Sequence, residues 1–242
     1  MKFSPALRQA RLIKRYKRFL ADVILPDGCH ATIHCPNTGS MKNCAPENAR
    51  VWYSQSSNSK RKYPFTWELV EIEERFKVSI NTGRANALVA EALCTKLIAP
   101  LAGYGKIQAE VKYGNENSRI DFLLSEHPEN PEELCYVEVK SVTLALDNGL
   151  GVFPDAVSSR GAKHLRELMQ MKANGHRAVL LYCVQHEGIE RVQPAYDIDP
   201  NYASLLQQAH DAGVEIYAYR ARITPQEIVL EKAVPFQFSA ED

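Results

Sequence analysis

The stretch that most constrains the fold runs from Arg119 to Lys140 and reads RIDFLL, a polar connection, and CYVEVK. Apolar and polar side chains alternate at both ends of this stretch with the period of two expected of β-strands. Glu138 and Lys140 therefore share one face of their strand. If the two strands pair as a hairpin, Asp121 approaches Glu138, and two carboxylates then stand beside an ammonium group on a rigid sheet.

This trio suits phosphoryl chemistry. Mg²⁺ prefers oxygen ligands, and a lysine beside them can orient an attacking water or neutralise charge that develops on a phosphate. We therefore interpret Asp121, Glu138 and Lys140 as candidate catalytic residues, with the two carboxylates as ligands of Mg²⁺ or Mn²⁺. The alternative is a surface ion pair between Asp121 and Lys140, with Glu138 solvated.

The 242 residues can form two domains or one large one, and their 45% hydrophobic and 24% charged content is ordinary for a soluble protein. No apolar run approaches the roughly 20 residues of a membrane span, and the basic N-terminus lacks the apolar stretch of a signal peptide. We expect a cytoplasmic protein without a membrane partner. The six cysteines include no C-x-x-C pair, which favours reduced, buried thiols.

Short strands dominate the first 80 residues, where helical periodicity is almost absent. Two alternating runs flank the turn at Pro26–Gly28 and predict a hairpin. Three further runs complete a set of five, with predicted ranges 19–25, 29–35, 51–56, 65–72 and 76–80. Five short strands in this length predict a small OB-like β-barrel, a fold that often binds single-stranded nucleic acid through cations and aromatics.

Possible zinc ligands also gather in this part of the chain: Cys29, His30, His34, Cys35 and Cys44. Strand alternation places two of the cysteines on one face and the two histidines on the other. No close paired-ligand spacing is present, which a structural zinc site would need. We therefore do not expect zinc here.

The segment Asn81–Arg84 is interpreted as the seam between two domains, 1–82 and 83–242. Beyond it the sequence predicts alternating helices and strands. The expected helices are 85–98, 160–173 and 202–212, and the expected strands are 107–111, 120–124, 135–140, 178–184, 214–219 and one more after Pro225. The chain is thus expected to be a two-domain α+β or α/β protein, a barrel followed by a mixed-sheet domain.

Charge is distributed unevenly, although the total is zero. Residues 1–62 contain twelve Lys or Arg and three Asp or Glu, so residues 63–242 carry the opposite excess. One interpretation is a basic N-terminal surface that meets a polyanion, and the other is an unspecific solvated face. The candidate DNA-binding residues here are Arg15, Lys17, Arg18, Lys60, Arg61 and Lys62.

A second candidate contact lies at the start of the helix predicted at 160–173. The serine pair before it can cap the helix, whose first backbone N–H groups then point at an anion. The first turn carries three further candidate DNA-binding residues, namely Arg160, Lys163 and His164. The alternative is that Asp155 pairs locally with Arg160 or Lys163.

The order helix, three strands, helix, strand, with Asp121 in the second strand and E-x-K in the third, resembles the core of the PD-(D/E)XK nuclease superfamily. At finer grain the chain resembles the sugar fermentation stimulation protein A family almost from end to end. The segments that carry this resemblance are RFLADVIL, HCPNTGSM, Asn81–Glu91, RIDF, YVEVKSVTL, FPDAVSSRG and KHLREL. The resemblance implies an OB-like domain, a nuclease-like domain, DNA binding without marked sequence preference, and a regulatory link to sugar (maltose) utilisation.

Residue by residue, the resemblance assigns the superfamily's metal ligands to Asp121 and Glu138 and its catalytic lysine to Lys140. A helix-borne acidic ligand, found in many members, would be Glu91. The predicted helix places Glu91 off its apolar stripe, which favours a solvated position. Ile120 precedes Asp121 where the superfamily's name has proline, but that position is variable.

Two functions follow from these observations. The first is a DNA-binding regulatory protein that retains a nuclease-like metal site. The second is an active Mg²⁺-dependent DNA endo- or exonuclease, which the intact trio of two carboxylates and a lysine favours. A structural barrel with a partner other than nucleic acid is a third interpretation, and the basic N-terminal part argues against it.

Overall fold

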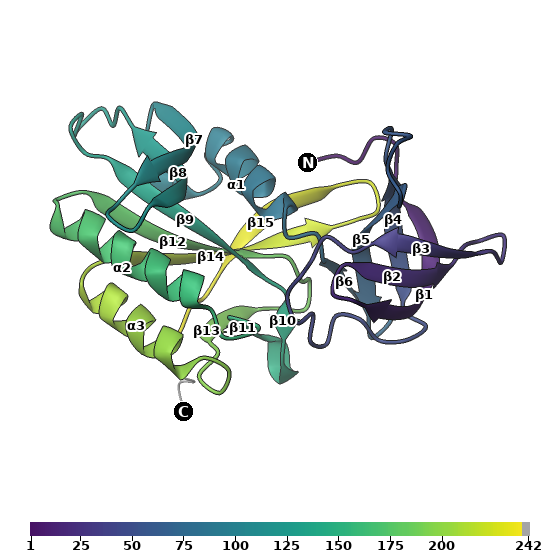
Figure 1. Ribbon diagram of the computed structural model, residues 1–242. Helices are drawn as coiled ribbons and strands as arrows, with labels where there is room; N and C mark the ends of the chain where they lie inside the picture. The colour runs from purple at the N-terminus through teal and green to yellow at the C-terminus, as the bar shows by residue number, and fades with distance from the viewer. Residues whose placement is uncertain (239–242) are drawn as a thin grey trace.

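The computed structural model describes residues 1–238 and consists of two lobes, a β-barrel and a larger mixed-sheet domain (Figure 1). The barrel is built from the N-terminal third of the chain. The larger domain contains all three α-helices of the described residues. This arrangement confirms the predicted fold class, an OB-like barrel followed by a mixed-sheet domain.

The barrel sheet has the strand order β3-β2-β1-β4-β5-β6, and a parallel contact between His34 and Thr66 closes β3 onto β5. The strands are β1 (Arg8–Tyr16), β2 (Leu20–Ile24), β3 (His30–His34), β4 (Arg50–Gln55), β5 (Phe65–Ile72) and β6 (Phe76–Ser79). Strand β1 was not predicted, because its many cations obscured the alternation. Its Ala10 and Leu12 point into the barrel core, while Arg11 and Lys14 are exposed.

Two of the three thiols in the barrel part of the chain contact other atoms of the protein. Cys35 and Cys44 are buried and Cys29 is exposed. The Cys35 Sγ lies 3.4 Å from the Met41 Sδ, and the Cys44 Sγ lies 3.3 Å from the carbonyl oxygen of Thr143. Burial raises the pKa of the Cys44 thiol to about 12, so this thiol stays protonated and packs as a small apolar side chain.

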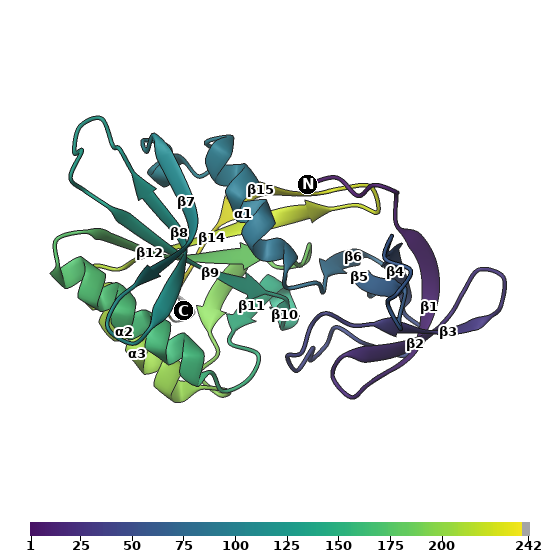
Figure 2. The same ribbon diagram turned by 45° about the horizontal axis from the view of Figure 1, so that its top comes forward.

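The main sheet of the larger domain has the order β15-β14-β12-β9-β8-β7. Its strands are β7 (Lys106–Tyr113), β8 (Ser118–Ser125), β9 (Cys135–Val142), β12 (Arg177–Val184), β14 (Glu215–Ile223) and β15 (Ile228–Val234). Three helices cover it, namely α1 (Arg84–Cys94), α2 (Ser159–Ala173) and α3 (Pro200–Asp211). Figure 2 shows α1 on one face of the sheet and α2 with α3 on the other.

Alternate residues of the central strand β12 explain this layering. Val179 and Leu181 join the apolar cluster that includes α1, while Leu180 and Tyr182 join the cluster of α2 and α3. A strand buried on both faces reads as the continuous apolar run seen in the sequence.

Helix α1 ends four residues earlier than predicted. Lys96 adopts a left-handed φ of 58°, and the Leu97 N–H donates to the Ala92 carbonyl, as in a Schellman motif. The chain turns away at this point, so the apolar residues that follow pack as part of a loop.

Three short strands form a separate small sheet of order β10-β11-β13, which the sequence did not predict. They are β10 (Leu144–Ala145), β11 (Leu150–Phe153) and β13 (Arg191–Pro194). Each is two to four residues long, too short to show a period of its own. Two 3₁₀ turns, η1 (Ala99–Leu101) and η2 (Asp147–Gly149), complete the described elements.

The first residues of the chain lie against the larger domain and not against the barrel. The Phe3 N–H donates to the Gln226 carbonyl, and the backbone of Lys2 pairs with that of Glu227, beside β15, as an isolated antiparallel β-bridge. Figure 2 shows this segment running alongside β15. Trp52 and Leu69 of the barrel share an apolar cluster with α1, so the two lobes are joined by a common core.

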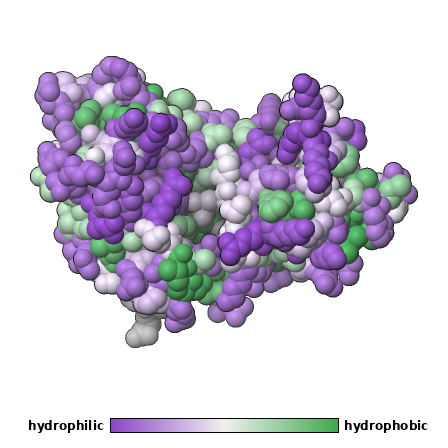
Figure 3. All heavy atoms as spheres, in the orientation of Figure 1, coloured by the Kyte–Doolittle hydropathy of each residue, from purple (hydrophilic) through white to green (hydrophobic). Residues whose placement is uncertain are grey.

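No helix within residues 1–238 is long and apolar enough to cross a membrane. Hydrophilic residues dominate the face seen in Figure 3, and this surface is indented where the two lobes meet.

Candidate active site

The two predicted carboxylates lie where the central hairpin stops pairing. Strands β8 and β9 pair from Leu124 with Cys135 to Phe122 with Val137, and the next pair in register would be Asp121 with Glu138. That pair is missing from the ladder. Instead, the Val139 N–H donates to the Asp121 Oδ2 at 2.7 Å. The side chain thus replaces a backbone partner, and the strands separate at the site.

Asp121 is fixed from a second side by helix α1. The Asn86 Nδ2 donates to the Asp121 Oδ1 at 2.7 Å. Both oxygens of this carboxylate therefore accept a hydrogen bond, one from the sheet and one from the helix. Asp121 is partly buried and held in one orientation.

Glu138 is only 2% exposed and forms the centre of a buried polar cluster. Its Oε1 accepts from the Lys140 Nζ at 2.6 Å and also contacts the His164 Nδ1. The Lys140 Nζ lies 3.0 Å from the same imidazole nitrogen. The other oxygen, Oε2, is buried and has no hydrogen-bond partner in the described chain.

The environments of the two carboxylates push their pKa values apart. Burial and the nearby charge of Glu138 raise the pKa of Asp121, and its hydrogen bonds offset this only in part. Burial would also raise the pKa of Glu138, but the contacts with His164 and Lys140 outweigh it and lower the pKa. Glu138 therefore remains ionised at a pH where Asp121 begins to take up a proton.

The donor set fits a hard divalent cation bound mainly by solvent or substrate. Within residues 1–238, no group of three His, Cys, Asp or Glu side chains is arranged to hold a metal ion. Two carboxylates are nevertheless what Mg²⁺ commonly takes from a protein, because it keeps several waters. The Glu138 Oε2 has no hydrogen-bond partner in the described chain, and each Asp121 oxygen retains a second lone pair.

Glu91, the helix-borne ligand that the resemblance implied, lies elsewhere. Its carboxylate contacts the amino group of Met1, and its side chain is 47% exposed. The α1 residue that reaches Asp121 is Asn86. Asn86 has no sequence signal of its own for this position, because the resemblance points only to an acidic residue of the same helix.

His164 also takes a different place from the one expected. Its ring is 4% exposed and contacts Glu138 and Lys140, so it belongs to the carboxylate cluster rather than to an exposed first turn. The signal for this position is the spacing of the buried residues Gly161, His164, Leu165 and Leu168 on one face of α2. Ser158 caps the helix by accepting from the Gly161 N–H.

The remaining candidate DNA-binding residues either contact other groups of the protein or are exposed on the barrel. Arg15 is a structural residue, because its guanidinium donates to the carbonyl groups of Arg18, Asn37 and Gly39. Arg160 Nε lies 3.4 Å from the buried imidazole of His164, and Lys163 is half-buried. The candidates that are exposed on the barrel are Lys17 and Arg18 in the β1–β2 turn and Lys60, Arg61 and Lys62 in the β4–β5 loop.

Comparisons with known proteins agree with this architecture. Residues 83–227 match the sugar fermentation stimulation protein RE domain, and residues 13–80 match the SfsA N-terminal OB domain. A sugar fermentation stimulation protein homolog of Shewanella loihica is 57% identical over 97% of this chain and 99% of its own length. Another from Shewanella woodyi is 55% identical over the same shares. The structure of Pyrococcus furiosus SfsA in complex with Ca²⁺ covers 98% of both chains with a TM-score of 0.85 and 23% sequence identity.

Proposed function

The chain belongs to the sugar fermentation stimulation protein family, and we propose that it binds DNA without marked sequence preference and hydrolyses phosphodiester bonds at Asp121, Glu138 and Lys140. One observation carries the catalytic part of this proposal. Glu138 presents a buried oxygen with no partner beside a lysine held at 2.6 Å from its other oxygen. An unpaired buried carboxylate oxygen is costly unless a ligand completes it.

Each residue has a distinct task in this proposal. Asp121 and Glu138 would hold Mg²⁺ or Mn²⁺, which when bound would polarise a phosphate oxygen as a Lewis acid. Lys140 neutralises negative charge that develops on the phosphate during attack. Asn86 and the Val139 N–H position Asp121, and His164 positions Glu138 through its contact with Oε1.

The direct test is a cleavage assay on single- and double-stranded DNA with Mg²⁺ or Mn²⁺. We expect Glu138→Ala and Lys140→Ala to lower the rate at least about a hundredfold, in the range of a missing electrostatic or acid–base contribution. Glu91→Ala is the control, because it removes a carboxylate of the same domain that lies outside the site, and its rate should be unchanged. Equal rates for the Glu138 variant and the parent protein would refute the assignment.

A second candidate is a non-catalytic DNA-binding regulator, and one observation favours it. Both oxygens of Asp121 already accept hydrogen bonds from the protein, so a cation would have to share them. The names of the relatives refer to stimulation of sugar fermentation, and a regulatory role in sugar (maltose) utilisation in the cytoplasm would be the biological setting of this candidate. Undiminished DNA binding without cleavage under any divalent cation would select it.

A further inference from the structure

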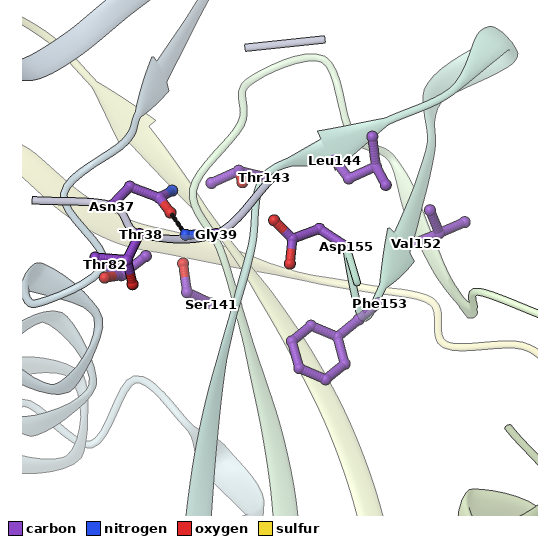
Figure 4. Close-up of a pocket in the computed structure, with 10 residues that line it drawn as sticks. All are labelled: Asn37, Thr38, Gly39, Thr82, Ser141, Thr143, Leu144, Val152, Phe153 and Asp155. Carbon is purple, nitrogen blue, oxygen red and sulfur yellow. Dashed lines mark hydrogen bonds between the residues drawn. The ribbon is translucent and has the colours of Figure 1, made fainter. Parts of the chain in front are cut away.

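A cavity of about 220 Å³ lies where the barrel meets the larger domain (Figure 4). Its walls come from the loop 37–39 after β3, Thr82 before α1, Ser141 and Thr143 at the end of β9, and Asp155. Segments far apart in the sequence thus meet in one pocket. None of the functions discussed above uses it.

The cavity has both polar and apolar walls. Four of the lining residues carry hydroxyl groups, namely Thr38, Thr82, Ser141 and Thr143, and no lysine or arginine among residues 1–238 lines it. In the described part of the chain, the charged group that lines the cavity is the Asp155 carboxylate, which points toward Gly39 in Figure 4. A phosphate would be repelled here, whereas a neutral group with N–H donors would be attracted.

Asp155 is held in place by one of its two oxygens. The Ser40 N–H and hydroxyl donate to Oδ2 at 3.0 and 3.1 Å. Oδ1 makes no hydrogen bond within residues 1–238 and is not among the polar atoms that are buried without a partner. It is therefore free to accept from a ligand. The loop passes so close that a Cβ on Gly39 would lie 2.7 Å from Oδ2.

The volume of the cavity suits an occupant of the size of a small ring. At a share of about 30 Å³ per water, 220 Å³ corresponds to about seven waters. The volumes of pockets for drug-sized ligands begin at about 300 Å³. The ring of Phe153 supplies an apolar wall. One nucleobase, a flat ring with polar edges, matches this combination.

The pocket lies where the barrel loop meets the strand that carries Lys140. Ser141 directly follows Lys140 in β9, and loop 37–39 continues from barrel strand β3. On the basis of the function proposed above, we propose that the pocket receives one base of the bound nucleic acid and that Asp155 accepts a hydrogen bond from its exocyclic amino group. Cytosine, adenine and guanine carry such a group, whereas thymine presents carbonyl acceptors instead.

The test compares two pyrimidine oligonucleotides, because cytosine and thymine are similar in size. We expect fluorescence anisotropy to show that oligo(dC) binds roughly fivefold more tightly than oligo(dT), in the range of one net hydrogen bond. Asp155→Asn should remove this ratio, because an amide can donate to thymine. Asp147→Asn is the matched control: it makes the same charge change at an exposed residue outside this cavity and should keep the ratio.

Free nucleosides separate this inference from the proposed function. Deoxycytidine, titrated into the full chain and followed by NMR, should shift resonances of the pocket, and Asp155→Ala, which removes the acceptor, should abolish the shifts. If oligonucleotides bind but dC and dT bind equally, the pocket assignment is overturned while DNA binding stands. If no oligonucleotide binds, the proposed function fails, and the nucleoside titration alone supports or overturns the pocket.

Discussion

At the scale of single residues, the two carboxylates of the candidate active site lie in different electrostatic environments. Asp121 accepts from two neutral donors, Asn86 and the Val139 N–H, and its pKa is raised by burial and by Glu138. Glu138 has Lys140 and His164 beside it, and its pKa is lowered. The same type of side chain is thus placed in two electrostatic environments, as in active sites that combine two ionisation states.

This contrast predicts how metal binding depends on pH. Protons compete with a cation for a carboxylate, so affinity falls as the pH drops through the titration range of the ligand. Because the pKa of Asp121 is raised, the loss of Mg²⁺ or Mn²⁺ affinity should begin above the pH at which an ordinary aspartate titrates. Calorimetry from about pH 8 downward measures it.

The control for this prediction is the double variant Asp121→Ala, Glu138→Ala, which should bind no cation at any pH. Undiminished binding by that variant would place the metal elsewhere. A decrease that begins only below the ordinary range of aspartate would show that the pKa of Asp121 is not raised.

At the scale of elements, the β7–β8 turn is tied to α2 by a buried carboxylate. Glu167 is 2% exposed and accepts from the backbone N–H groups of Asn115 and Glu116. Gly114 in this turn has a φ of 68°, and a Cβ there would lie 1.5 Å from the Glu167 Oε2. The turn therefore needs glycine both for its conformation and for the approach of Glu167.

Gly114→Ala should lower the free energy of unfolding by about 3 kcal/mol or more. About 1–2 kcal/mol comes from the left-handed backbone, and the rest from displacing a buried carboxylate from its donors. Urea denaturation monitored by circular dichroism gives the value.

Gly175→Ala provides the comparison, since Gly175 has a φ of 88° and no atom lies within 4 Å of the position that a Cβ would take. It should cost only the backbone share of about 1–2 kcal/mol. Equal changes in the two variants would mean that Glu167 moves aside without penalty.

At the scale of the whole molecule, two lobes share one apolar cluster and differ in charge. Trp52 and Leu69 of the barrel belong to the same apolar cluster as Leu88 of α1, and the Arg84 guanidinium pairs with the buried Glu68 at 2.8 Å. The lobes are therefore expected to move as one body. The excess of positive charge in residues 1–62 then stays in a fixed position relative to Glu138 and Lys140.

If the barrel cations contact phosphates, DNA affinity depends on counterion release. Changing Lys60, Arg61 and Lys62 together to Ala should weaken binding by a similar factor on two unrelated sequences. For each phosphate that is no longer neutralised, the slope of log affinity against log salt should become shallower by about 0.9 on duplex DNA and about 0.7 on single strands. Fluorescence anisotropy over a salt series measures both.

The matched control changes three exposed lysines of the larger domain, Lys96, Lys106 and Lys112, to Ala. It alters the net charge by the same amount and should leave most of the slope, as should Lys140→Ala. A salt response that is flat in the parent protein would show that the barrel cations are an unspecific solvated surface.

Elements whose signal is local could be predicted from the sequence. Alternation identified five barrel strands and the hairpin of Asp121 and Glu138, and continuous apolar residues marked the buried strand β12. The alternation also predicted that Glu138 and Lys140 share one face, since a period of two can be recognised from neighbouring residues. Strand β1 was missed because the pattern of its buried residues is carried by only a few apolar side chains among cations.

The residues that surround those carboxylates depend on tertiary packing. Asn86 lies 35 positions from Asp121, His164 lies 26 positions from Glu138, and Ser40 lies 115 positions from Asp155. No local period links residues at such separations. The contacts arise because α1 and α2 pack on opposite faces of one sheet and because the barrel loop reaches the end of β9, and both depend on how the apolar faces are buried together.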